Sequence, residues 1–340
     1  MVGALVVAVG TGLYFGVVRD SGGSSSDSLD GGGFDNLLTL DPCSYLDPDS
    51  FAGFADKGVG DAPAVRIEPT GFDSCAVELE RSEKGGPRYT VTVRTETGYI
   101  VPSEVPDDLE VAERGAVQVT TADVALDCAQ LIFRPDGTTV SVDTKASVTD
   151  AEGGYSRETL CRIQDIATDA AVAALGANTA DRMAYPADSL GGTRPCSRLE
   201  DAEIMSATGA VEVSKRERDR DYVCIWSAGP ASVTLAAKLV PTAADRPDGA
   251  RETIAGRQST IVDQFFFSNT ETCDITLYGR TWTPWPGKQY DYAETGDDSS
   301  SGFIELTELS VSLFSGGSRE EACRMARELA ERAWPRLPGA

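Results

Sequence analysis

Apolar residues recur at helical spacing in two segments, one near the middle of the chain and one near its end. The later segment, which starts at Gly316, carries its apolar stripe at Ala322, Met325, Ala326, Leu329 and Ala333. The earlier segment, which starts at Gly153, carries a similar stripe at Leu160, Ile163, Ala167 and Ala171. Each pattern predicts an amphipathic helix with one face on a core, and the small alanines allow close packing. Ser318 and Glu321 are spaced as a capping box that begins the later helix.

Alternating apolar and polar positions predict strands before these helices. The stretches "RYTVTVRTE" (88–96) and "TVSVDTKASV" (139–148) both alternate, as half-buried strands do. Asp47 or Asp49 can cap a short helix, and residues 200–207 are also helix-like. Since the strands are joined by hairpin-length turns, we expect an antiparallel sheet with an N-terminal and a C-terminal helix, an α+β domain.

The chain contains this arrangement twice. Both helical segments begin with glycines, Ser-Arg-Glu, two further residues and a cysteine. The stretch "DPCSYLDPDSF" around Cys43 matches "RPCSRLEDAEI" around Cys196, and the neighbourhoods of the remaining cysteines match in the same order. We therefore predict a tandem duplication, with an insertion in the last cysteine interval of the second copy.

The eight cysteines form two matching sets of four. They are Cys43, Cys75, Cys128, Cys161, Cys196, Cys224, Cys273 and Cys323. Without a Cys-x-x-Cys motif, an even number beyond a membrane anchor is typical of disulfides in an oxidising compartment. Each copy allows three pairings, of which we favour first with second and third with fourth, all within a copy. Loops of this size contribute about 3–4 kcal/mol each in the chain-entropy model.

The first residues resemble a membrane anchor on a tether. Residues 2–18, "VGALVVAVGTGLYFGVV", form an uncharged run close to the lower limit of about 17 residues for a spanning helix. A Gly/Ser-rich stretch follows it, as in flexible linkers. A cleaved signal peptide is the alternative, although no convincing cleavage site follows. The expected organisation is a transmembrane anchor at 1–19, a flexible linker at 20–37, a first repeat at 38–178, a linker at 179–193 and a second repeat at 194–340.

The composition argues against several classes of catalytic site, metal site and partner. The 340 residues include no histidine, which removes Ser-His-Asp and Cys-His catalysis and histidine-bound metals. Motifs for Ser-Lys catalysis, the Gly-x-Ser-x-Gly turn and phosphate loops are missing too. With 30 basic and 54 acidic residues the net charge is −24, which disfavours nucleic acid as a partner. We therefore expect a non-enzyme with no catalytic residue, no metal site and no cofactor.

The motif "DPCSYLD", with Cys75 in a strand and a cysteine on a helix, resembles an actinobacterial secreted lipoprotein family, a cysteine-containing domain of unknown function. The four-cysteine layout is also similar to the extracellular sensor domain of mycobacterial receptor serine/threonine kinases. The resemblance covers about residues 38–178 and again 190–338. It implies a Mog1/PsbP-like domain with paired disulfides on the outer face of the cell membrane. Lipid anchoring is not carried over, because the chain has no lipobox cysteine.

The leading hypothesis is a membrane-anchored, extracytoplasmic binding or sensor-like protein of the cell envelope, with an unknown ligand or protein partner. Its candidate binding surface is the aromatic cluster Trp282, Trp285, Tyr290 and Tyr292, in a chain with only 7% aromatic residues. Such rings are favoured at recognition surfaces, although local packing is the alternative. Two other functions stay open: a structural accessory subunit of an envelope or secretion complex, and a carboxylate-based cell-wall hydrolase with an acid of raised pKa in a cleft.

Overall fold

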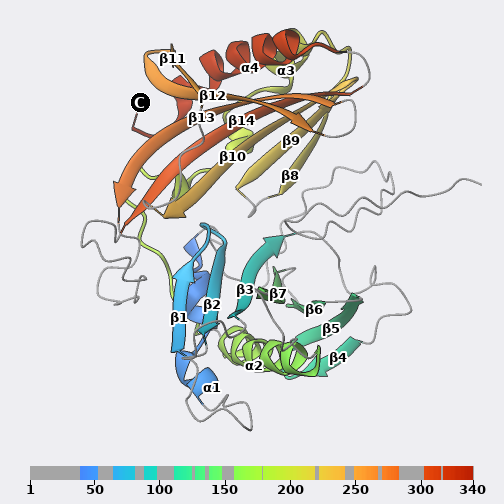
Figure 1. Ribbon diagram of the computed structural model, residues 1–340, viewed down its shortest axis with the longest axis vertical. Coiled ribbons are helices and arrows are strands. Elements are labelled where there is room, and N and C mark those ends of the chain that lie inside the picture. Colours follow the sequence, from blue (N-terminus) through green and yellow to red (C-terminus); the bar gives the residue numbers. More distant parts are fainter. Residues whose placement is uncertain are drawn as a thin grey trace, which may run out of the picture.

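Two seven-stranded antiparallel sheets, one from each half of the chain, form the protein (Figure 1). The computed structural model describes residues 39–52, 64–80, 88–97, 111–124, 127–134, 138–147, 157–177, 179–218, 222–241, 249–266, 270–282, 302–314 and 317–339. In Figure 1 the first sheet occupies the lower half and the second sheet the upper half. The expected antiparallel, two-domain layout is therefore confirmed.

Short N-terminal helices precede the strands of the first sheet and one long C-terminal helix follows them, and the contacts among these helices place them on one face of the sheet. The helical elements are η2 (Pro42–Tyr45), α1 (Pro48–Ala52) and α2 (Arg157–Gly176). The strands are β1 (Ala64–Pro69), β2 (Ser74–Glu80), β3 (Arg88–Thr97), β4 (Val111–Arg114), β5 (Val117–Val124), β6 (Asp127–Phe133) and β7 (Thr138–Ser147). Their order in the sheet is β1-β2-β3-β7-β6-β5-β4, so the last strand enters at the centre.

The second sheet has corresponding elements. The helical elements are η5 (Pro195–Ser197), α3 (Asp201–Thr208), α4 (Arg319–Ala333) and η6 (Trp334–Arg336). The strands are β8 (Ser214–Arg218), β9 (Val223–Ala228), β10 (Ala231–Pro241), β11 (Ala250–Ile254), β12 (Arg257–Phe266), β13 (Thr270–Trp282) and β14 (Phe303–Phe314). Read from β8, their order is β8-β9-β10-β14-β13-β12-β11. The seven positions match those of the first sheet one by one, as a duplication predicts.

All eight cysteines are paired, and each pair stays within one repeat. The bridges are Cys43–Cys75, Cys128–Cys161, Cys196–Cys224 and Cys273–Cys323. Their Cα atoms lie 5.0–5.2 Å apart, within the usual range for disulfides. The favoured pairing of first with second and third with fourth cysteine is the one present.

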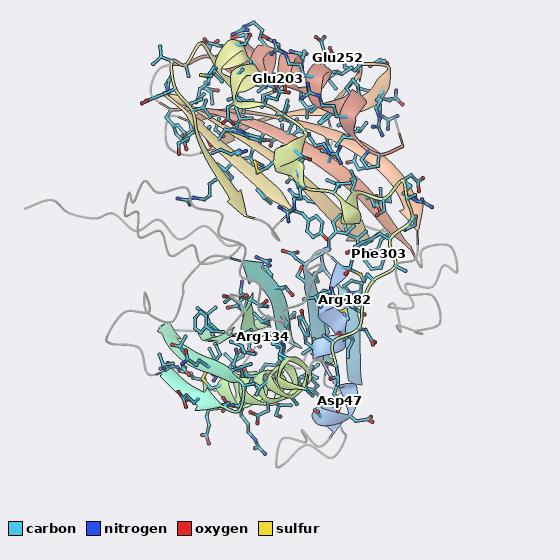
Figure 2. All side chains as sticks on the ribbon, turned by 180° about the vertical axis from the view of Figure 1, so that it is seen from behind. Asp47, Arg134, Arg182, Glu203, Glu252 and Phe303 are labelled. Atoms are coloured by element: carbon cyan, nitrogen blue, oxygen red, sulfur yellow. A yellow bond between two sulfur atoms is a disulfide. The ribbon has the colours of Figure 1, made fainter. Side chains whose placement is uncertain are left out.

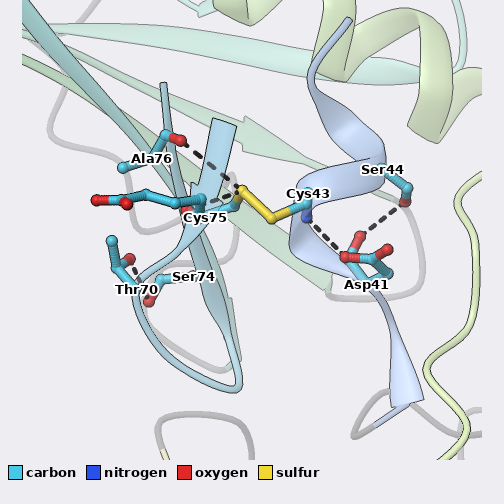
Figure 3. The surroundings of a disulfide bond; sticks show 8 residues. Asp41, Cys43, Ser44, Thr70, Ser74, Cys75 and Ala76 are labelled. Atoms are coloured by element: carbon cyan, nitrogen blue, oxygen red, sulfur yellow. Dashed lines mark hydrogen bonds between the residues drawn. A yellow bond between two sulfur atoms is a disulfide. The ribbon is translucent and has the colours of Figure 1, made fainter. Parts of the chain in front are cut away.

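The shared Pro-Cys-Ser motif forms a 3-10 turn at the first bridge of each repeat. In the first repeat the Asp41 carboxylate accepts a bond from the Cys43 amide at 2.9 Å, and the Ser44 hydroxyl donates to the Asp41 carbonyl at 2.7 Å (Figure 3). In the second repeat the Ser197 hydroxyl donates to the Arg194 carbonyl in the same way. These hydrogen bonds within the motif fix the conformation of the turn, and the turn positions the cysteine next to the strand to which its disulfide connects.

Strand register identifies the face of each sheet that the helices cover. Cys128 lies opposite Thr144 and Cys273 lies opposite Val311. Both cysteines are bridged to a covering helix, α2 or α4, so alternate residues from these positions face inward. On α4 the predicted alanines are completely buried, which lets the helix approach the sheet closely.

The two cores differ in polarity at matched positions. In the first repeat, the Thr144 hydroxyl donates to the buried Gln164 side-chain oxygen at 2.5 Å, and the Gln164 amide donates to the Val142 carbonyl. In the second repeat, register places Val311 where Thr144 lies, and Ala326 where Gln164 lies. At these two positions, the first core therefore has a buried polar pair where the second core has apolar side chains.

The predicted linker makes contacts with the first repeat, which in turn contacts the second repeat. Its Arg182 (labelled in Figure 2) pairs with Leu40 in an isolated antiparallel bridge. The Tyr185 ring contacts Phe72 of the β1–β2 turn edge-on, with centroids 5.9 Å apart, and Phe72 also contacts Tyr222 of the second repeat, at 4.8 Å. These rings connect the first repeat, the linker and the second repeat.

The predicted anchor, residues 2–18, lies outside the described residues, and none of the described helices is long and apolar enough to span a bilayer.

The Ser318 hydroxyl caps α4 by accepting from the Glu321 amide at 3.2 Å. The return bond of the predicted capping box is not formed among the described residues. That part of the prediction is wrong, because the Glu321 side chain is exposed to water.

Candidate functional site

The aromatic cluster proposed from the sequence is described only at its first residue. Trp282 is the last residue of β13 and lies opposite Phe303, which Figure 2 labels at the end of the second sheet nearest the first repeat. Trp285, Tyr290 and Tyr292 lie outside the described residues. The structure therefore leaves this surface as a prediction.

A polar pocket lies near the same end of the second sheet, on the face that α4 covers. Its volume is about 280 Å³. The sheet supplies Arg257, Leu277, Tyr278, Gly279, Arg280, Glu305 and Thr307, and the other walls are Asp188 and Leu190 from the linker and Leu337, Pro338 and Gly339 from the C-terminal tail. We call these residues the second-repeat pocket. It exists because the linker and the tail cross the sheet beyond the end of α4.

A β-bulge shapes the sheet wall. The β13–β14 register shifts between Tyr278 and Thr281, and a bulge of this kind redirects a side chain to the other face. Arg280 accordingly forms an ion pair with Asp188 of the linker. A Cβ atom on Gly279 would lie 3.0 Å from the Glu305 carbonyl oxygen, so glycine allows the close approach of the two strands.

Glu305 fixes the linker wall from inside. Its side chain is 1% exposed. One carboxylate oxygen accepts from the Ser189 hydroxyl at 2.5 Å and the other from the Leu190 amide at 2.8 Å. Because charged hydrogen bonds of this kind are stronger than neutral ones, Glu305 holds residues 189–190 against the sheet.

Three donor groups in the pocket have unused bonding capacity. The Thr307 hydroxyl oxygen and the Arg280 Nε are buried and have no hydrogen-bond partner. The Arg257 guanidinium is half-buried and donates to the Trp334 carbonyl at 3.2 Å, and no carboxylate of the described residues lies within ion-pair distance of it. Burial lowers the pKa of Arg257, since desolvation disfavours the charged form. Native proteins normally satisfy such groups.

These polar groups are specific to the second copy. Register aligns Arg257 with Val117 and Thr307 with Val140 of the first repeat. Both valines are buried, at 3% and 0% exposure. The second repeat therefore has a guanidinium and a hydroxyl at this end of the sheet, where the first repeat has two apolar side chains.

The pocket is suited to binding through donors. Its two carboxylates already accept bonds, Asp188 from Arg280 and Glu305 from the linker. Among the described residues no group of three or more cysteine, aspartate or glutamate side chains is arranged to hold a metal ion. What the pocket can offer a ligand is N–H and O–H groups beside the apolar side chains of Leu190, Leu277 and Leu337.

Sequence reasoning did not find the pocket. Arg257 stands in the polar stretch "GRQST", where a charged residue is ordinary. A residue-by-residue comparison of the two copies would have given one signal, since Arg257 replaces an apolar residue at an inward position. The bulge at Gly279 and the passage of the linker over the sheet have no comparable local signature.

Comparisons with known proteins give no relative from which to carry over a function. No family model matches the chain, and no curated protein matches it. Among solved structures it is similar to the di-domain ARO/CYC StfQ from the steffimycin biosynthetic pathway, with 11% identity, a TM-score of 0.19, and coverage of 87% of this chain and 95% of that one. The di-domain ARO/CYC BexL from the BE-7585A pathway has 12% identity, a TM-score of 0.16, and coverage of 87% and 96%. MucB in complex with MucA(peri) has 10% identity, a TM-score of 0.11, and coverage of 78% and 91%. TM-scores this low carry no argument about fold or function.

Proposed function

We propose that this protein is a non-catalytic binding protein of the cell envelope, held at the membrane by residues 2–18 with both repeats outside the cytoplasm. Each repeat is then a Mog1/PsbP-like α+β domain, as in the secreted family that the cysteine motifs resemble. The four disulfides support an oxidising, extracytoplasmic location, because such bonds are rare in the cytosol.

One observation carries the binding role: the second-repeat pocket holds buried donors that the chain itself leaves unsatisfied. Thr307 is 2% exposed and its hydroxyl has no partner. Leaving a buried polar group without a hydrogen bond costs about 1–3 kcal/mol. A ligand that accepts these bonds would recover that free energy. Buried hydroxyls without a partner also occur in the first repeat, at Thr120 and Thr168, but Thr307 and Arg280 differ from them in lining a pocket.

The arrangement of carboxylates supports binding over hydrolysis. A carboxylate-based hydrolase needs one acid that donates a proton to the bond being cleaved. In the pocket, Glu305 accepts from Ser189 and Leu190, and Asp188 is paired with Arg280. Both acids are thus engaged as acceptors within the wall.

Equilibrium binding of the full-length, oxidised chain in mild detergent tests the proposal. The panel should contain neutral sugars, amino acids, short peptides, organic acids and phosphates. We expect at least one class to bind the native protein and to lose binding in a Thr307→Leu variant, whose larger side chain fills the pocket. The matched control is Val140→Leu, which places the same side chain at the equivalent position of the first repeat. The proposal fails if no class binds, or if Thr307→Leu binds as well as the control.

A further inference from the structure

We infer that the ligand of the second-repeat pocket presents a single carboxylate to Arg257, Thr307 and Arg280. This inference rests on the proposed binding function and adds the chemical class of the ligand. All three residues line the same pocket. At the positions that match Arg257 and Thr307, the first repeat has the apolar residues Val117 and Val140.

The bonding capacity of the pocket sets the polarity of the ligand. A guanidinium has five N–H donors and no acceptor. Arg257 donates to one backbone carbonyl, and the Nε–H of Arg280 has no acceptor at all. The Thr307 hydroxyl adds a further donor. A group rich in acceptors, such as an oxyanion, satisfies these donors, whereas an ammonium group would leave them unsatisfied.

The charges around the donors favour one negative charge over two. Of the two arginines in the pocket, Arg280 is paired with Asp188, and Arg257 has no carboxylate partner among the described residues. Asp188 and Glu305 line the same pocket, and like charges repel at such short range. A monoanionic carboxylate therefore fits better than a dianionic phosphate.

The size and the apolar walls restrict the rest of the ligand. The volume of about 280 Å³ is slightly below the roughly 300–1,000 Å³ of typical ligand pockets. Leu190, Leu277 and Leu337 contribute apolar surface beside the donors. The pocket thus suits a short aliphatic acid, either free or as the C-terminal residue of a peptide.

Matched acids and amides distinguish charge from shape. The probes are N-acetylalanine and its amide, trialanine and its C-terminal amide, and inorganic phosphate, each titrated to about 10 mM so that millimolar dissociation constants are detected. The protein is the full-length oxidised chain in mild detergent, followed by calorimetry. We expect each acid to bind at least tenfold more tightly than its amide. The stronger of the two acids identifies a free acid or a peptide end as the source.

Substitutions at Arg257 measure how much this residue contributes to carboxylate binding. Arg257→Gln should weaken carboxylate binding at least tenfold, and Arg257→Lys should retain part of it, because the charge remains while the planar fork is lost. Arg251→Gln on the neighbouring strand β11, at an exposed position outside the pocket, is the matched control and should bind as the native chain does. Unchanged spectra and bridged cysteines confirm that each variant is folded.

Each outcome decides between the two proposals. If an amide binds as tightly as its acid, if phosphate binds more tightly than both acids, or if Arg257→Gln binds like the control, the carboxylate inference is wrong while the pocket remains a binding site. If neither these probes nor the wider panel binds, the proposed function itself is wrong.

Discussion

Replacing Gln164 and Thr144, singly and together, measures what the buried polar pair contributes to the stability of the first repeat. Both side chains are at most 1% exposed, and the Thr144 hydroxyl oxygen lies 2.5 Å from the side-chain oxygen of Gln164. Gln164→Met keeps the length of the side chain but leaves the Thr144 hydroxyl without an acceptor. Thr144→Val keeps the shape but removes the donor to the Gln164 oxygen.

The magnitude follows from the cost of a buried group without its partner. Each single substitution should lower the free energy of unfolding of the first repeat by about 1–3 kcal/mol. The double variant replaces both partners with apolar groups, as Val311 and Ala326 do in the second repeat. Its cost should therefore be smaller than the sum of the two single costs by about 1–3 kcal/mol, which is the coupling free energy.

The chain offers a separate probe for each repeat. All four tryptophans, at positions 226, 282, 285 and 334, belong to the second half of the sequence. Urea unfolding followed by tryptophan fluorescence thus reports on the second repeat, and hydrogen exchange of α2 peptides reports on the first. The variants should shift the exchange of α2 and leave the fluorescence midpoint unchanged. Additivity of the two single costs within about 0.5 kcal/mol would show that the pair contributes no specific interaction.

Three further predictions concern the repeats and their charges. Cutting the oxidised chain within the linker 179–193 should give two fragments that part in denaturant without thiol; fragments that separate only after reduction would contradict the pairing within repeats. The pKa of Glu203 lies below its ordinary value of 4.5, mainly through the hydrogen bond from Arg336, so its contribution to stability is complete above that value and is lost as the pH falls below it. Urea midpoints should therefore fall less on acidification in Glu203→Gln than in the native chain, and equal falls would argue against the pair. Burial raises the pKa of Asp274, although a hydrogen bond from Ser310 acts in the opposite direction. Because the folded state disfavours the charged carboxylate, Asp274→Asn should raise the urea midpoint at pH 7 and change it little at a pH where the carboxyl is protonated. A lower midpoint at pH 7 would refute this reasoning.

Local patterns predicted the elements better than their arrangement. Period-two alternation at residues 88–96 and 139–148 corresponds to β3 and β7, because half-buried strands leave that pattern. The pairing of these two strands at the centre of the sheet joins segments far apart in sequence, and no local pattern records it. The matched cysteines supplied the long-range information, since a bridge must connect neighbouring elements.

The pocket depends on features that local patterns do not show. Glu305 is a charged residue in a strand, which a sequence presents as an outward position, yet its side chain is buried under the linker. Arg280 reaches the pocket side only because a bulge interrupts the alternation. Both cases arise where a tertiary contact overrides the period of the strand, which is expected at functional or strained sites.

The position of the bridges has a consequence for how the chain responds to proteolysis. In each repeat one disulfide ties the N-terminal turn to an inner strand, and the other ties the long helix to the sheet. A protease that cuts once between the two cysteines of any bridge leaves the pieces covalently joined, and the helix that shields the apolar face cannot be peeled away. The chain can therefore be nicked in these intervals without exposing the surface that would make it aggregate.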